Sequence, residues 1–275
     1  MTTSGQSIQF SCSKCKTILK EAASPDRPPS ISEECPACGC QLSETLQVQS
    51  KTHANKQHTV FQTAYEVNTC LCLGITEIDS FLALRSGDRL CIVGDYANQL
   101  VSRLCVRAFM PVRQGGLGAG SVVFVDGGNS SDIYRCVNFA RQFGLEIQKV
   151  LGGIAVSRAF TIHQLAALVA HELPKAIRQF NAKLVVVSDL LRMFTEDPQV
   201  SRREARYLIS EIMESVHKID NVLLVMSLRD NSPYDSQILP SFGKRIEANH
   251  LNIKLHNGRK SRQVAMPEKE LYIAR

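Results

Sequence analysis

Five short apolar runs, rich in β-branched residues, recur along the chain after about residue 88. They cover 89–94, 121–126, 183–189, 222–228 and 251–255. Near-continuous hydrophobic runs of this length are typical of strands that are buried on both faces, as in a parallel sheet. The pattern therefore predicts a buried, mostly parallel sheet.

Amphipathic segments separate the predicted strands. Apolar residues recur at helical spacing from Ile133 to Phe143, and again from Ala205 to Ile219. The second segment opens with SRRE, from Ser201 to Glu204, which is the pattern of a helix capping box. Strands that alternate with helices imply right-handed βαβ crossovers. The expected fold class is α/β, with a doubly wound core.

The N-terminal part has a different composition. Residues 1–48 hold five of the ten cysteines and a Pro-rich insert, and residues 49–60 are polar and without period. We expect a small module at 1–48, a linker at 49–60 and the α/β core at 61–275.

Four cysteines of the first module form two CxxC pairs, in CSKC and CPAC. The predicted ligands of one structural Zn²⁺ are Cys12, Cys15, Cys35 and Cys38. Two such turns can each place two thiolates on one tetrahedral ion, and a module of about 40 residues needs a metal to fold because its core is small. We therefore predict a zinc ribbon, with Cys40 as a spare cysteine.

Composition and charge bound the location and the partners. With 44% hydrophobic and 21% charged residues, the chain is an ordinary globular protein. No window approaches the roughly 20 apolar residues of a membrane span, and the start MTTSGQSIQF has no signal-peptide core. A cytoplasmic protein without a membrane partner is expected. Residues 241–275 carry eight basic against three acidic groups, which points weakly to phosphate-bearing partners.

The loop after the first core strand reads GDYANQLV, from Gly94 to Val101. A phosphate-binding P-loop at this place uses a Gly-rich backbone, a Lys for the terminal phosphates and a Ser or Thr for Mg²⁺. Here the Lys and Thr positions hold Leu100 and Val101. The segment alone therefore carries no nucleotide-binding motif.

Four segments in the same order resemble the RecA/RadA recombinase superfamily, and within it most closely the short archaeal RadB-like paralogs. They are GITEIDSFL, then VVFVDGGNSSDIYRCVNFARQFGLEIQKVLGGIAVSRAFTIHQL, then KLVVVSDLLRMF, and finally SFGKRIEANHLNIKLHNGRKSRQVAMPEKELYI. The resemblance runs from about Gly74 to the C-terminus and implies a RecA-like fold.

The same resemblance implies a vestigial nucleotide site at Gly94, Asp95 and Asp189. Only Asp189 matches a functional residue of the family, the metal-binding aspartate. The catalytic Glu maps to Gly128 and the γ-phosphate-sensing Gln to Leu228. Because the phosphate cradle, base and sensor are all replaced, we expect a pseudo-ATPase with no catalytic residues, for which ATP is not an expected cofactor.

Basic residues in the segments that resemble the family's DNA-binding loops and closing strands predict a partner in single-stranded DNA. They are Arg202, Arg203, Arg206, Arg229, Lys244, Arg245, Arg259, Lys260 and Arg262. Such side chains neutralise phosphates without reading sequence. The alternative is that they are solvated helix faces, with Arg202 and Arg206 paired to Glu211 or Glu214.

Two further functions remain open at this point. One is a KaiC-like nucleotide-binding switch to which Asp95 and Arg103 contribute, and the other is a protein-interaction scaffold without nucleic acid. Phe61 and Ala64 form an F-x-x-A pattern, which recombinases of this superfamily use to dock onto a neighbouring core. We therefore expect self-association or docking onto a recombinase, the alternative being that Phe61 packs on its own core.

Overall fold

The computed structural model describes residues 7–11, 18–22, 69–229, 232–250 and 252–265. The chain divides into two units, Met1–Phe61 and Gln62–Arg275. In the first unit, β1 (Ser7–Ser11) pairs antiparallel with β2 (Ile18–Ala22). In the described residues, no helix is both long and apolar enough to cross a membrane.

The described part of the second unit is built on one sheet, in the strand order β10-β9-β8-β3-β7-β6-β4-β5. Its strands are β3 (Arg89–Val93), β4 (Val122–Asp126), β5 (Ile154–Arg158), β6 (Leu184–Ser188), β7 (Leu223–Leu228), β8 (Lys244–Ala248), β9 (Asn252–Asn257) and β10 (Lys260–Ala265). The strands from β8 to β5 in this order are parallel, and β9 and β10 are antiparallel. The predicted α/β class with a mostly parallel sheet is confirmed.

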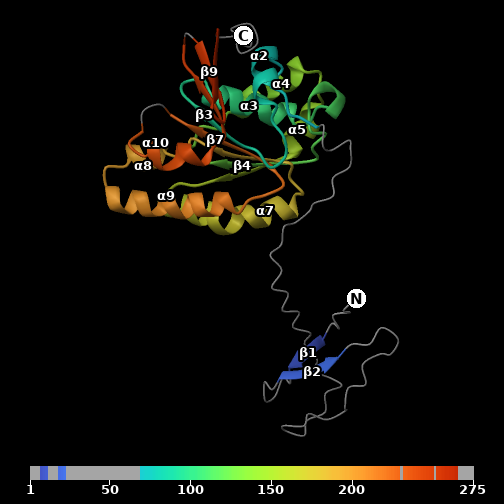
Figure 1. The fold of residues 1–275 in the computed structure, drawn as a ribbon. Helices are drawn as coiled ribbons and strands as arrows, with labels where there is room; N and C mark the ends of the chain where they lie inside the picture. Colours follow the sequence, from blue (N-terminus) through green and yellow to red (C-terminus); the bar gives the residue numbers. More distant parts are fainter. Residues whose placement is uncertain (1–6, 12–17, 23–68, 230–231, 251, 266–275) are drawn as a thin grey trace. The chain divides into compact units, whose positions relative to one another are not determined.

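Helices cover both faces of this sheet (Figure 1). One face carries α2 (Thr76–Leu82), α3 (Ala97–Arg107), α4 (Ile133–Gln142) and α5 (Ile147–Gly152). The other carries α6 (Ile162–Ala167), the π-helical turn η2 (Leu168–Glu172), α7 (Leu173–Gln179), α8 (Arg192–Glu196), α9 (Arg202–His217) and α10 (Asp235–Ile238). Short 3₁₀ turns lie at Val112–Gln114 (η1) and Leu239–Ser241 (η3).

Alternation along the strands divides the core between the two faces. In β3, Leu90 and Ile92 pack beneath α3, whereas Cys91 and Val93 pack on the side of α9. This follows from the two-residue period of a strand, which sends neighbouring side chains to opposite faces. A strand buried on both faces therefore reads as a continuous apolar run, as β3, β4, β6 and β7 do. The fifth predicted strand, β9, is also present, but its buried residues alternate with more exposed ones.

The start of α9 confirms the predicted cap in part. Ser201 Oγ accepts a hydrogen bond from the backbone N–H of Glu204 at 3.2 Å. The Glu204 carboxylate contacts His163 Nε2 at 3.1 Å, so this side chain joins α9 to α6. The helix thus begins where SRRE predicts.

Two buried arginines of α3 form hydrogen bonds with the backbone of the segment that precedes α2. Arg103 Nε donates to the Leu73 carbonyl at 2.6 Å, and Arg107 donates to the carbonyls of Cys72 and Gln114. Both guanidinium groups lie over the ring of Phe143, at 4.9 and 5.2 Å from its centre. Burial of these charges is tolerated because carbonyls and an aromatic face replace water.

Candidate functional site

Polar side chains gather where the parallel strands end. Asp126 closes β4, Asp189 follows β6 and Arg229 follows β7, and these strands are adjacent in the sheet. Ligands of open α/β sheets bind outside the carboxyl ends of the strands. This carboxyl edge is therefore the candidate site.

Asp189 is buried at this edge, with 2% of its surface exposed. Its φ of 52° is a left-handed conformation that Asp adopts more readily than most other non-glycine residues. Its backbone N–H donates to Ser227 Oγ at 2.8 Å, and that oxygen lies 3.4 Å from Asn98 Oδ1 in α3. The backbone of Asp189 is thus held by β7, through a serine that also contacts α3.

The guanidinium group of Arg229 pairs with the Asp189 carboxylate. Arg229 Nε lies 3.2 Å from Asp189 Oδ1, and Arg229 Nη2 lies 3.3 Å from Oδ2. This two-pronged geometry matches the guanidinium fork to both carboxylate oxygens. The third nitrogen, Nη1, donates to Glu196 Oε1 at 2.8 Å. Arg229 therefore lies between two carboxylates.

The contacts continue into α8 and back to the loop after β4. Arg192 Nε donates to Glu196 Oε2, and Arg192 Nη1 donates to the Gly128 carbonyl, both at 2.8 Å. The hydrogen bond from Arg192 lowers the pKa of Glu196. We call the chain of contacts through Asp189, Arg229, Glu196, Arg192 and Gly128 the carboxyl-edge network. It links the loops that follow β4, β6 and β7.

Gly128 has no space for a side chain. A Cβ placed there would lie 2.5 Å from both Cβ and Oδ2 of Asp189. Such contacts are far inside van der Waals distance, so any larger residue would displace the aspartate. The resemblance assigns the catalytic glutamate to this position, and the geometry around it accommodates glycine.

Asp126 is a second buried carboxylate of the edge, and its surface is 0% exposed. Its oxygens accept the backbone N–H groups of Ser130 at 3.0 Å and Ser131 at 3.1 Å, and Arg158 Nε lies 3.3 Å away. Burial raises the pKa of Asp126, but the hydrogen bonds from Ser131 and Ser130 and the charge of Arg158 outweigh it, so the pKa lies below its usual value.

The loop between β3 and α3 is short. Only Gly94, Asp95 and Tyr96 lie between the strand and the first residue of the helix, Ala97. Leu100 and Val101 are already helical, and both are buried in the core beneath α3. Asp95 Oδ2 contacts His250 Nε2 at 3.0 Å, and the Tyr96 hydroxyl lies 3.3 Å from His250 Nδ1.

Arg103, which the sequence offered as a contributor to a nucleotide-binding switch, is buried in α3. It is 3% exposed and lies between Leu73 and the rings of Phe139 and Phe143. These contacts are structural, and the contribution of Arg103 to a nucleotide-binding switch stays a prediction.

The basic residues assigned to nucleic acid fall into two groups. Arg229 is in the carboxyl-edge network, Lys244 Nζ contacts Asp88 at 2.6 Å, and Arg245 Nε contacts Glu247 at 2.9 Å. Those in the second group are exposed: Arg202, Arg203 and Arg206 on α9, with Arg259, Lys260 and Arg262 at the β9–β10 hairpin. Arg262 also lies 5.3 Å from the centre of the Phe81 ring.

An apolar surface surrounds the edge strand β5. Its exposed residues are Ile133 (57% exposed), Tyr134 (77%), Val156 (52%) and Phe160 (71%). A cavity of about 650 Å³ opens here between α4 and β5, and Cys136, Leu151 and Ile154 are among the residues that line it. The outer side of β5 has no strand partner in the described sheet.

Some predicted residues lie outside the described residues. These are the predicted zinc ligands Cys12, Cys15, Cys35 and Cys38, the linker 49–60, and Phe61 and Ala64 of the F-x-x-A pattern. The pair Cys12 and Cys15 falls, in sequence, between β1 and β2.

The contacts also reveal residues that the pattern of the sequence did not single out: Asp126, Arg158, Arg192 and Glu196. Asp126 could have been noticed as the charged end of an apolar strand, in the same position as Asp189. Arg192 and Glu196 are four residues apart, which is the spacing of a helical ion pair. The sequence gives no sign that Glu196 also contacts Arg229 or that Arg192 contacts the Gly128 carbonyl.

Residues 70–226, more than half of the chain, match the family model described as Rad51. This agrees with the parallel sheet and with an aspartate at the end of β6. The chain belongs to the Rad51 family.

Three relatives show how far the likeness extends. The DNA repair and recombination protein RadA of Cenarchaeum symbiosum (strain A) is 30% identical over 105 residues, 38% of this chain and 26% of that protein. Meiotic recombination protein DMC1 homolog A of Oryza sativa subsp. japonica is 31% identical over 117 residues, 40% of this chain and 33% of that protein. DNA repair protein RAD51 homolog 1 of Arabidopsis thaliana is 25% identical over 176 residues, 62% of this chain and 48% of that protein. The matched region therefore spans between about a quarter and a half of each relative.

Proposed function

We propose that this chain is a non-catalytic recombinase paralog that acts in DNA repair or recombination by binding single-stranded DNA, a recombinase partner, or both. The names of its relatives place them in DNA repair and recombination. The carrying observation is the pairing of Asp189 with Arg229 through both carboxylate oxygens.

The pairing bears on catalysis because Asp189 matches the aspartate that holds the metal ion in the family. A carboxylate that already accepts two hydrogen bonds from a guanidinium group has less capacity for a cation. Release of Arg229 would also leave a buried charge without compensation, which is costly. The residues present do not fit a Mg²⁺–nucleotide complex, and no ATP turnover is expected.

Other positions of the site support the same proposal. Leu100 and Val101 are core residues, and Leu228 is buried in β7. At Gly128, Asp189 leaves no space for a side chain. None of these side chains can neutralise a phosphate, act as a base or sense a γ-phosphate. Phosphoryl transfer depends on such preorganised polar groups.

The exposed basic residues support the binding of nucleic acid. Within the described residues, the guanidinium groups of Arg202, Arg203 and Arg206 have no ion-pair partner. Three unpaired cations within two turns of one helix favour a polyanionic ligand, whose bound counterions they would release.

The apolar surface at β5 supports the proposal that the chain binds a protein partner. Exposed aliphatic and aromatic side chains beside a free strand edge suit an extended peptide that adds a strand and buries an aromatic anchor. The F-x-x-A pattern at Phe61 and Ala64 has this chemistry, and a second copy or a recombinase could supply it. Phe61→Glu should then abolish self-association with no change in melting temperature, whereas lost thermal stability with unchanged sedimentation would assign Phe61 to the chain's own core.

ATP hydrolysis and DNA binding should be measured on the same preparation. We expect no ATP turnover above background, with or without oligo(dT). The fluorescence anisotropy of labelled oligo(dT) should show binding, and its affinity should fall steeply as the salt concentration rises. Turnover that disappears on Asp189→Ala would overturn the non-catalytic proposal. A melting temperature raised by ATP and Mg²⁺ would favour a nucleotide-binding switch instead. Binding to neither DNA nor ATP would favour a protein scaffold.

The zinc ribbon is part of the proposal. One equivalent of Zn²⁺ after chelator-free purification is expected, held by Cys12, Cys15, Cys35 and Cys38. Cys40→Ser should retain the metal, whereas Cys38→Ser should lose it. Loss of zinc from Cys40→Ser with retention in Cys38→Ser would show that Cys40 is the ligand.

A further inference from the structure

Charges along α9 run against the helix dipole. Arg202 and Arg203 occupy its first turn and Arg206 its second, while Glu211 and Glu214 lie nearer its C-terminal end. A helix favours acidic groups at its N-terminal end and basic groups at its C-terminal end. Glu204 in the first turn and His217 in the last turn suit the dipole, but the first turn still carries a net positive charge. The dipole therefore does not account for the arginines.

Pairing within the helix does not explain these arginines either. Helical neighbours are three or four residues apart, and at these distances Arg206 faces Arg202, Arg203, Ile209 and Ser210 rather than an acid. Glu204 contacts His163. The alternative that Glu211 or Glu214 neutralises Arg202 and Arg206 is thus wrong for the described structure, which contains no such ion pair.

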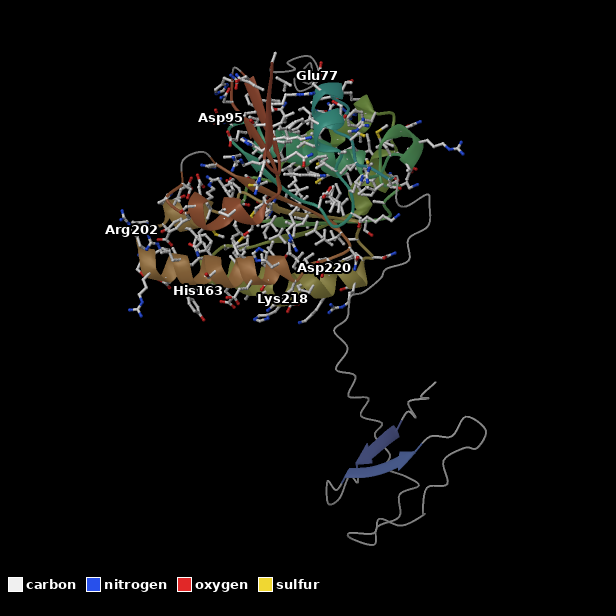
Figure 2. The ribbon with its side chains drawn as sticks, viewed as in Figure 1. Glu77, Asp95, His163, Arg202, Lys218 and Asp220 are labelled. Atoms are coloured by element: carbon white, nitrogen blue, oxygen red, sulfur yellow. The ribbon has the colours of Figure 1, made fainter. Side chains whose placement is uncertain are left out.

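An aromatic ring lies within the same cluster. Tyr207 is one helical turn after Arg203, and 70% of its surface is exposed. In the described part of the chain its hydroxyl has no hydrogen-bond partner and its ring no aromatic neighbour. Figure 2 labels Arg202 at the start of α9, with Lys218 and Asp220 after its end, so the cluster occupies the N-terminal end of the helix.

The setting of Tyr207 differs from that of the two other most exposed rings, Tyr134 and Phe160. Tyr134 and Phe160 belong to the apolar surface at β5, whose neighbours are Ile133 and Val156. Tyr207 has arginines beside it instead, at positions 203 and 206. Cationic side chains beside an exposed ring are the combination that single-strand binding proteins use, because the cations neutralise phosphates while the ring stacks on a base.

We propose that Tyr207 is a base-stacking platform for single-stranded DNA, whose phosphates are neutralised by Arg202, Arg203 and Arg206. The inference rests on the proposed binding of single strands and adds to it the residue that contacts the bases. Stacking on a ring is independent of sequence, since every base has an aromatic face.

The chain contains no tryptophan, which permits a direct test. Tyr207→Trp introduces a single indole at the proposed platform, and oligo(dT) should quench its fluorescence with the same concentration dependence as binding. Tyr134→Trp is the matched control, because Tyr134 is also highly exposed but lies on α4. Its fluorescence should not change. Equal quenching of both variants, or of neither while DNA binds, would overturn the assignment.

Affinity separates stacking from charge. Tyr207→Ala should weaken binding of oligo(dT) about tenfold, the scale of one base stacked on a ring, while Tyr207→Phe should retain the affinity. Neither variant should alter the slope of affinity against salt, because neither removes a charge. Unchanged affinity of Tyr207→Ala contradicts the stacking role, and an equal loss in Tyr207→Phe would assign the effect to the hydroxyl.

The two levels of proposal fail in different ways. If wild type does not bind oligo(dT) even at low salt, the proposed binding function fails and the platform with it. If wild type binds and Tyr207→Ala binds as well, only the platform fails. Quenching of the indole by oligo(rU) but not by oligo(dT) would overturn DNA as the ligand.

Discussion

Arg229 has a carboxylate on each side of its guanidinium group, whereas Arg203 has none within the described residues. Both arginines were assigned to nucleic acid from their position in sequence. Arg229 ends a buried strand, where charge must be compensated, and Arg203 lies on a solvated helix face, where it need not be. A basic residue available to a ligand is therefore distinguished by the absence of partners rather than by its exposure, since Arg229 is itself half-exposed.

The comparison predicts that Arg229→Leu is among the most destabilising of the changes considered. It removes the only side chain that contacts both oxygens of buried Asp189 in the described structure. We expect a loss of about 2 kcal/mol in the free energy of unfolding, below the range for fully buried pairs because Arg229 is half-exposed. Urea denaturation measures it. Arg229→Leu combined with Asp189→Asn should recover most of the loss, and equal stability of wild type and Arg229→Leu would contradict the role of the pair.

Gly128→Ala tests the packing beneath the same pair. The added methyl group would meet the Asp189 side chain at 2.5 Å, so we expect a loss of about 1–3 kcal/mol by urea denaturation. Gly152→Ala is the control, because nothing lies within 4 Å of a Cβ there and the residue ends α5. That change should be neutral or slightly stabilising. A neutral Gly128→Ala would mean that Asp189 moves freely.

Asp126 should make stability depend on pH. Its pKa is lower in the folded protein, so its contribution is complete above the unfolded pKa of about 4 and is lost as the pH falls through the folded value. Asp126→Asn should cost about 1–2 kcal/mol at neutral pH, from hydrogen bonds to a charged acceptor. Unfolding measured from about pH 7 downward should show the two proteins converging in acid. A constant difference would indicate that packing, not charge, is lost.

Neutralising the unpaired arginines of α9 should weaken DNA binding and leave the stability of the fold unchanged. The triple variant Arg202→Gln, Arg203→Gln and Arg206→Gln should bind oligo(dT) at least about tenfold more weakly, with a smaller salt slope. Its stability should stay within a few tenths of a kcal/mol of wild type, or rise, because the dipole no longer opposes these charges. The matched control neutralises the exposed residues Arg113, Arg141 and Lys149. Equal loss of affinity in the control would mean that net charge alone governs binding.

The β9–β10 hairpin should make the smallest contribution. Changing Arg259, Lys260 and Arg262 to Glu is expected to weaken binding of single strands uniformly across sequences, by a few-fold beyond the control. Anisotropy on oligonucleotides of several sequences measures this. Lys244→Gln on the adjacent strand should leave affinity unchanged, because Lys244 is occupied by Asp88. Wild-type affinity in the Glu variant would show that the hairpin is merely solvated.

Strands buried on both faces could be predicted, because their apolar runs are continuous. Three strands of the sheet, β5, β8 and β10, were not among the five runs. The edge strand β5 is partly exposed, β8 reads KRIEA, with charged residues that find partners in the structure, and β10 reads KSRQVA and is mostly exposed. Periodicity also located α4 and α9, and the cap at Ser201 marked the start of α9.

The candidate site could be predicted only in part. Asp189 was found through its place after an apolar strand and through a resemblance to a family. Its partner Arg229 was taken for a ligand-binding residue, because a linear sequence does not show that β7 lies beside β6 or that Glu196 of α8 meets the same guanidinium group. Pairing depends on three-dimensional neighbours, and so does the exposure of Tyr207 beside unpaired arginines.

The hydrogen bonds from α3 to the backbone of Cys72 and Leu73 have a mechanical consequence. Arg103 and Arg107 bind backbone carbonyls there, and Asp79 accepts the backbone N–H groups of Leu73, Gly74 and Ile75. Tension applied through the chain ahead of Thr69 would therefore be borne by a helix at the centre of the core, and would not peel a strand from the edge of the sheet. Because these hydrogen bonds are made to main-chain atoms, they do not depend on the chemistry of the Cys72 side chain, whereas the Leu73 side chain is needed for the core.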